Sequence, residues 1–314
     1  MELLDMTHSF MATDPRDKVY ALIALAREAD RGLVPDYSIS ATQMLRELVR
    51  HLILTDNNLV ALSGNRLPLL KAMEEFCSWT PDPERVFPSS RGDWKPEGTS
   101  FKASSSRAPA VTFSSDLTFL TVQGITVDQI NTIIGPLEYT NPRWLPRELG
   151  GIQEPFIGMD ELLQYGAKLS ATKRDIFWRT LVLGTWDRGR GRRTYPAPAE
   201  IGHWFEVMLG NQSEVDGIGI LEANKRFCQQ IGFVDRCFYT TASGKMGIGP
   251  YGTQRGDIVT ILYGGQFCYI LREVGEHYVL VGDAYLHGAM YGELVDPDRP
   301  EERGKYEERT FVLR

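Results

Sequence analysis

A glycine-rich stretch, residues 232–293, constrains the fold of this chain more than any other part of its 314 residues. Within it, short apolar segments alternate with turn residues, most of them glycine. The apolar segments are Cys237 to Thr241, Ile258 to Leu262, Phe267 to Arg272 and Tyr278 to Val281. Apolar runs bounded in this way are typical of antiparallel strands joined by tight turns. We therefore expect a β-meander, with Gly247-Ile248-Gly249 in one of its turns.

The chain before the meander is expected to be mainly helical, because apolar residues recur there at helical spacing. The expected helices are 14–32, 40–52, 160–170, 174–183, 200–209 and 215–230. Residues 111–123 alternate instead and predict a hairpin, which residues 124–130 then leave. The predicted fold class is α+β, a helical layer packed on an antiparallel β-meander or partly closed barrel.

Prolines and glycines between residues 136 and 155 predict a connection between two halves of the chain. The first half, 1–135, would hold helices, short strands and a long loop at 84–109. The second half, 136–314, would hold helices followed by the meander. We expect the two halves to form one compact unit.

The charge balance argues against a nucleic-acid partner. The formal net charge is -7 and the isoelectric point is near 5.4, whereas phosphate-binding surfaces usually carry an excess of Lys and Arg. One local exception is RGRGRR at 188–193, which predicts either a solvated loop or a clamp for an anion.

Several other classes of site are excluded by missing patterns. The four cysteines show no CxxC spacing and no histidine at metal-ligand spacing, so we expect buried free thiols and no metal. The chain has no P-loop, GxGxxG, HExxH or GxSxG motif, so no cofactor is expected. It also lacks a signal sequence and any apolar run of about 18 residues, which predicts a cytoplasmic protein without a membrane partner.

Titratable side chains gather at the end of the meander. On a strand, Asp283, Tyr285 and His287 would share one face, because side chains alternate. Such a set could perform acid–base chemistry or orient a carbonyl, or it could form a structural hydrogen-bond network. Arg272 on the neighbouring strand could pair with Glu273, Asp283 or Glu293. The candidate catalytic residues are His287, Tyr285, Arg272 and Asp283.

Aromatic residues in loops provide candidate walls for a pocket. Trp79 lies between two prolines and either closes a core or lines a pocket. The candidate pocket residues are Trp79, Trp94, Phe101, Trp178 and Tyr291.

Short blocks along the chain resemble fungal heterokaryon-incompatibility (HET) domain proteins. These blocks are DPRDKVYAL at 14–22, PDYS at 35–38, SWTPD at 78–82, RTL at 179–181 and GDAYLHGAMYGE at 282–293. The resemblance implies the region that follows the N-terminal HET effector domain, a domain tied to cell death on non-self recognition. Because that effector domain would be absent, its function cannot be carried over to this chain.

Two functions are compatible with this resemblance. The first is a cofactor-independent cyclase of Diels–Alder type in fungal terpenoid biosynthesis, similar to norbornene-forming cyclases. Such an enzyme needs a shaped apolar site and one hydrogen-bond donor, and its partner would be an apolar small molecule. The alternative is a non-catalytic regulatory or interaction module. A homo-oligomer is compatible with either function.

Overall fold

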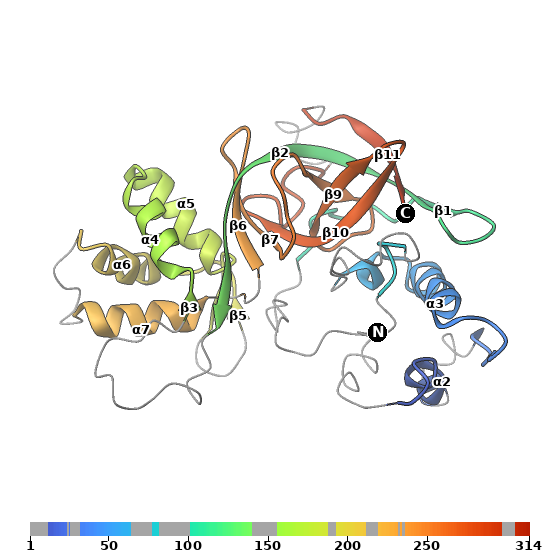
Figure 1. The fold of residues 1–314 in the computed structure, drawn as a ribbon. Helices are drawn as coiled ribbons and strands as arrows, with labels where there is room; N and C mark the ends of the chain where they lie inside the picture. Colours follow the sequence, from blue (N-terminus) through green and yellow to red (C-terminus); the bar gives the residue numbers. More distant parts are fainter. Residues whose placement is uncertain are drawn as a thin grey trace.

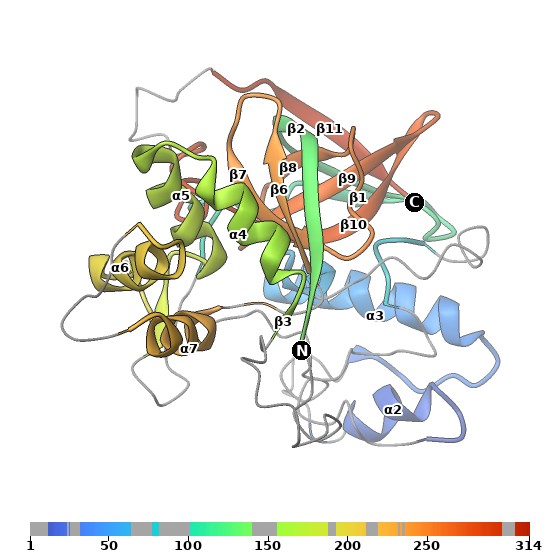
Figure 2. The same ribbon diagram turned by 60° about the vertical axis from the view of Figure 1, so that its left-hand side comes forward.

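The computed structural model describes residues 12–23, 25, 32–63, 77–81, 101–139, 156–187, 193–211, 219–231, 233, 236–296 and 305–314. The fold is α+β, as the sequence predicts: helices flank a nine-stranded sheet that is mostly antiparallel. In Figure 1, helices α4–α7 gather on one side of the β-structure, whereas α2 and α3 lie on another. Figure 2 shows the same division after a turn of 60°.

The helices follow the predicted pattern closely. They are α2 (Asp17–Ile23), α3 (Ala41–Asp56), η2 (Val60–Leu62, a 3-10 helix), α4 (Met159–Ala167), α5 (Ala171–Leu181), α6 (Ala199–Met208) and α7 (Ile220–Gln230). Ser40 caps α3, because its side chain accepts a hydrogen bond from Gln43 N at 3.1 Å.

The strands include all four predicted for the meander. The strands are β1 (Val111–Phe113), β2 (Leu120–Tyr139), β3 (Phe156–Ile157), β4 (Trp186–Asp187), β5 (Arg193–Thr194), β6 (Arg236–Thr241), β7 (Met246–Pro250), β8 (Ile258–Leu262), β9 (Cys268–Val274), β10 (His277–Leu286) and β11 (Glu308–Leu313). Strands β4 and β5 form a separate small hairpin.

Strand β2 organises the sheet. Its first half pairs with β8 and β11, and its second half pairs with β6. The expected departure of residues 124–130 is wrong, because the strand continues through them. Gly124 permits the close pairing there: a Cβ at this position would lie 2.3 Å from the carbonyl oxygen of Ile261. Residues 135 and 136, where the two expected halves meet, lie within β2.

The pairings return on themselves and make the sheet partly ring-like. Strands β2, β8, β9, β10 and β11 pair in that order, and β11 pairs again with β2. The β6–β7 hairpin links the second half of β2 to the end of β10. The ring is not a regular barrel, since the contact between β10 and β11 is the single pair Tyr278 and Leu313.

Strand β7 corrects the prediction of a turn at Gly247-Ile248-Gly249. These residues pair with β6, and Ile248 and Gly247 also pair with the end of β10. A Cβ on Gly247 would lie 2.3 Å from the Tyr239 ring and 2.4 Å from the Tyr285 carbonyl oxygen. The glycine is therefore required by close packing within a buried strand rather than by a turn.

Two hydrophobic cores lie against the sheet. The larger core joins α4–α7 to β6, β7 and the end of β10. The smaller core joins α3 and η2 to residues of β2 and β8–β11. The end of β10 therefore lies in the larger core, where it meets the helical layer.

Candidate functional site

Tyr285 and His287 form a hydrogen-bonded pair at the end of β10. The Tyr285 side chain is 3% exposed, and its hydroxyl lies 3.2 Å from Nδ1 of His287. The backbone N–H of His287 donates to the carbonyl oxygen of Met246 at 3.0 Å and so continues the pairing with β7. The structure thus confirms that these two side chains meet.

The protonation of this pair follows from its surroundings. Burial raises the pKa of Tyr285 well above its usual value, so the phenol keeps its proton. Burial, and secondly the charge of Arg179, lowers the pKa of His287, although Asp175 opposes the shift. A protonated phenol beside Nδ1 can donate to a neutral imidazole when the imidazole proton is on Nε2. We accordingly assign the imidazole proton to Nε2.

Three further aromatic rings surround the pair, and we call the five residues Phe101, Tyr195, Tyr285, His287 and Tyr291 the aromatic cluster. The ring of Tyr291 lies 4.3 Å from that of Tyr195 and 5.6 Å from that of Phe101 between centroids. Phe101 lies 6.0 Å from Tyr285. Tyr195 is 54% exposed and forms the outer side of the cluster.

Tyr291 contributes a polar atom that the fold does not use. Its hydroxyl is buried and forms no hydrogen bond with the part of the chain that the structure describes. Burial, with smaller contributions from Tyr195 and Glu293, raises the pKa of this phenol. The group is therefore a protonated donor without an acceptor, which is rare in folded proteins.

The loop after β10 places Tyr291 in the cluster. Lys102 N donates to the carbonyl oxygen of Met290 at 2.8 Å, and Tyr291 N donates to Oε2 of Glu293 at 2.6 Å.

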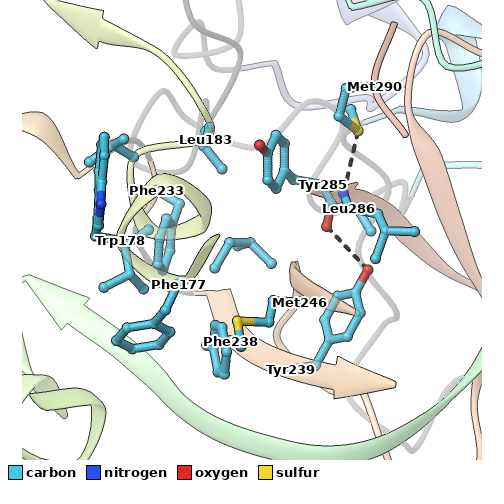
Figure 3. Close-up of a cluster of buried hydrophobic side chains, with 14 of the residues drawn as sticks. Phe177, Trp178, Leu183, Phe233, Phe238, Tyr239, Met246, Tyr285, Leu286 and Met290 are labelled. Atoms are coloured by element: carbon cyan, nitrogen blue, oxygen red, sulfur yellow. Dashed lines mark hydrogen bonds between the residues drawn. The ribbon is translucent and has the colours of Figure 1, made fainter. Parts of the chain in front are cut away.

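Figure 3 shows Tyr285 beside the buried hydrophobic cluster, with its carbonyl facing Tyr239. The Tyr239 hydroxyl donates to that carbonyl oxygen at 3.1 Å.

Asp283 has a different role from its two neighbours in the motif. Its Oδ1 accepts from Nη2 of Arg236 at 2.7 Å, and its carbonyl oxygen accepts from Nη1 of the same guanidinium at 2.7 Å. This ion pair is buried and joins β10 to β6. The sequence analysis did not identify Arg236, since nothing local marks a partner 47 residues away.

Arg272 is also used within the fold, but none of its three predicted partners is the one observed. Its guanidinium donates to both carboxylate oxygens of Asp257, at 2.8 and 2.9 Å, and to the carbonyl oxygen of Gly252 at 2.7 Å. Asp257 holds this turn further, because its Oδ2 accepts from Gln254 N at 2.7 Å. Arg272 therefore anchors the turn before β8.

The predicted pocket residues separate into different parts of the structure. Trp79 is fully buried in the smaller core, 5.8 Å from Phe113, and its indole donates to the Thr118 carbonyl. It closes that core, as one of the two interpretations predicts. Trp178 lies in the larger core, while Trp94 falls outside the described residues. Phe101 and Tyr291 are the predicted wall residues that join Tyr285.

Trp178 contacts a polar pair, Asp175 and Arg179, whose charges act on His287 of the aromatic cluster. Asp175 accepts hydrogen bonds from the Trp178 indole at 3.1 Å and from Nε of Arg179 at 2.9 Å. The Arg179 guanidinium also stacks over the Trp178 ring at 4.3 Å. The positive charge that helps to lower the pKa of His287 is thus paired with a carboxylate.

The last arginine of RGRGRR serves the fold. Arg193 donates to the carbonyl oxygens of Gln230 and Ile231, at 2.7 and 3.1 Å, and so caps the C-terminal end of α7. Residues 188–192 fall outside the described ranges, so the choice between a solvated loop and an anion clamp stays open for them.

All four cysteines are buried and free, as predicted. Within the described ranges, no three His, Cys, Asp or Glu side chains gather where they could hold a metal ion. No helix among the described residues has both the length and the apolar character needed to cross a membrane.

Comparison with known proteins finds similarity to a heterokaryon-incompatibility protein and to a domain model named after it. Residues 222–305 match the Het-6 beta-barrel domain, which covers most of α7 and strands β6–β10. The chain is also 24% identical over 364 residues to "Heterokaryon incompatibility protein 6, OR allele" of Neurospora crassa. That match covers 92% of this chain and 50% of the relative, so the chain spans about half the relative's length. No solved structure matches.

Both matches support the relationship that the short sequence blocks predict. The similarity extends beyond the β-structure, because the alignment covers nearly all of the chain. Neither match points to a cyclase.

Proposed function

We propose that this chain acts as a non-catalytic interaction module in a fungal heterokaryon-incompatibility system. The observation that carries the proposal is the use of two of the four predicted catalytic side chains within the fold. Asp283 is bound by Arg236 and Arg272 by Asp257, so neither side chain is available for a substrate without breaking an ion pair. The similarity to an incompatibility protein over 92% of the chain supports the same function.

A hyphal-fusion assay, in which fungal cells fuse without mating and cell death is scored, tests this proposal. The gene would be introduced into a filamentous fungus that lacks it, and the transformant would be paired with strains of differing incompatibility type. We expect uptake of a vital dye in fused cells of at least one pairing, and no uptake in pairings of the untransformed parent. Survival of all fused cells, with normal protein levels confirmed by immunoblot, would contradict the proposal.

One observation favours a second candidate, a cofactor-independent cyclase acting on a terpenoid. His287 is half-buried next to Tyr285, and its Nε2–H could donate to a carbonyl group of a substrate held against the aromatic cluster. Polarisation of a carbonyl by a positioned donor is the type of assistance that a Diels–Alder reaction uses.

The cyclase candidate has its own test. Purified protein would be incubated with terpenoid and polyketide polyenes that carry a carbonyl group, with heat-denatured protein as the measure of background cyclisation. The candidate requires a product above background that decreases when His287 is replaced by Ala. Equal product with active and denatured protein would remove it.

A further inference from the structure

We propose that the aromatic cluster is a binding site for a flat, neutral ligand whose carbonyl oxygen accepts a hydrogen bond from the Tyr291 hydroxyl. The inference goes beyond the proposed function, because binding requires neither turnover nor a protein partner. It rests on the buried hydroxyl of Tyr291, which has no acceptor among the described residues.

The unused hydroxyl specifies the polar part of the ligand. Buried polar groups in native proteins nearly always have a partner, so one that lacks a partner among the described residues can be completed by a bound water or another small molecule. The neighbouring phenol of Tyr285 is already bonded to His287, so it does not compete for the same acceptor. Tyr291 keeps its proton in this environment, and the missing partner is therefore an acceptor.

The charges around the cluster favour a neutral acceptor over an anion. Glu293 is held beside Tyr291 by the Tyr291 backbone N–H and contributes to raising the pKa of Tyr291 and Tyr285. Near His287, the charge of Arg179 is paired with Asp175 at 2.9 Å. An anionic ligand would be repelled by the Glu293 carboxylate, and the Arg179 charge near His287 is already paired. A ketone or enone oxygen meets no such repulsion.

The surrounding rings specify the apolar part of the ligand. The ring of Phe101 packs edge-on against the Tyr291 ring, with 5.6 Å between centroids. The ring of Tyr195 packs against it at a tilt, with 4.3 Å between centroids. Flat rings of this kind favour offset or edge contacts with a planar ligand. Tyr195 is 54% exposed, so its ring can move aside more readily than the fully packed Phe101, which is 2% exposed. A ligand would therefore enter from the Tyr195 side.

Three probes of similar shape separate the contributions of the ligand's parts. Acetophenone carries a neutral carbonyl on a ring, ethylbenzene lacks the oxygen, and benzoate carries a negative charge. Binding to the full chain would be measured by saturation-transfer NMR, with the imidazole Hε1 signal of His287 as a reporter of location. We expect acetophenone to bind about three- to tenfold more tightly than ethylbenzene, as one neutral hydrogen bond predicts. Benzoate should bind more weakly than acetophenone.

Tyr291→Phe tests the assignment of the donor. The variant keeps the ring, so it should bind ethylbenzene as the wild type does but lose the advantage of acetophenone. Tyr251→Phe is the matched control, because Tyr251 is 53% exposed and lies outside the cluster. The control should bind all three probes as the wild type does.

Three results would overturn the inference. They are equal binding of acetophenone and ethylbenzene by the wild type, an advantage of acetophenone that survives Tyr291→Phe, and no change in the His287 signal with acetophenone at its solubility limit. The last result would mean that the hydrogen-bond partner of the Tyr291 hydroxyl is a water molecule and not this class of ligand. None of these results bears on the fusion assay, so the two proposals fail separately.

Discussion

Arg236 and Asp283 form an ion pair in which Nη2 and Oδ1 lie 2.7 Å apart and the side chains are 2% and 1% exposed. The guanidinium also donates to the Asp283 carbonyl oxygen, so one side chain fixes both the carboxylate and the backbone of β10. Asp283 lies two residues before Tyr285, so the pair holds the part of β10 that carries Tyr285.

Replacing Asp283 with Ala should destabilise the protein strongly. The change leaves the Arg236 guanidinium buried without its carboxylate, and loss of one partner of a buried pair typically costs about 3–5 kcal/mol. The free energy of unfolding from urea denaturation measures this loss. Glu307→Ala is the control, because it removes an ion pair with Arg309 whose side chains are 74% and 53% exposed. Similar losses in the two variants would mean that Asp283 does not stabilise β10 through Arg236.

Removing the two hydroxyls of the aromatic cluster should have different effects on stability. Tyr285→Phe loses the hydrogen bond to His287, which should cost about 0.5–1.5 kcal/mol. Tyr291→Phe removes a hydroxyl that forms no hydrogen bond with a described residue, so the free energy of unfolding should stay the same or increase. Thermal and urea unfolding without added ligand compare the two variants. A larger loss for Tyr291→Phe than for Tyr285→Phe would show that the Tyr291 hydroxyl has a partner in the fold.

The lowered pKa of His287 predicts how stability changes with pH. The unfolded chain takes up this proton near the ordinary histidine pKa of about 6.5, whereas the folded chain takes it up only at lower pH. The unfolded state therefore binds more protons in the window below about pH 6.5, and stability falls as pH decreases through it. Above that window, His287 does not make stability depend on pH, because its imidazole is neutral in both the folded and the unfolded state.

Two measurements check this pH dependence. The NMR titration of the His287 imidazole should give a midpoint below that of an unfolded histidine. In urea unfolding between pH 5 and 7 (about the range in which histidine titrates), His287→Gln should lose less stability on acidification than the wild type. Parallel curves for the two proteins would contradict the assignment of a neutral, buried imidazole.

The sequence predicts the strands of this fold better than it predicts their partners. Glycine between apolar runs located β6, β8, β9 and β10, because turns need residues that tolerate unusual backbone conformations. The same rule failed at β7, where Gly247 is required by the approach of the Tyr239 ring. A glycine that allows a turn and a glycine that allows close packing look alike in one sequence.

The candidate site was predictable only in part, for a related reason. Tyr285 lies on β10 and His287 directly after it, two residues apart, so alternation brings them to one face. Tyr195 lies 96 positions before Tyr291 in the sequence, and periodicity carries no information about such a contact. The partners Asp257 and Arg236 were missed because ion pairs between strands depend on register.

Gly184 sets the space available to the Tyr285 hydroxyl, and replacing it with Ala should disturb the cluster. Its φ is +67°, and a Cβ there would lie 3.0 Å from the Tyr285 hydroxyl and 3.4 Å from the Tyr195 ring. Gly244→Ala is the matched control, since its φ is +85° and nothing lies within 4 Å of the added atom. Both variants should lose about 1–2 kcal/mol to backbone strain. Gly184→Ala should lose about 1–3 kcal/mol more through overpacking, measured by urea unfolding, and should shift the His287 imidazole signal. Equal losses, with an unchanged His287 signal, would mean that Tyr285 and Tyr195 move aside without cost.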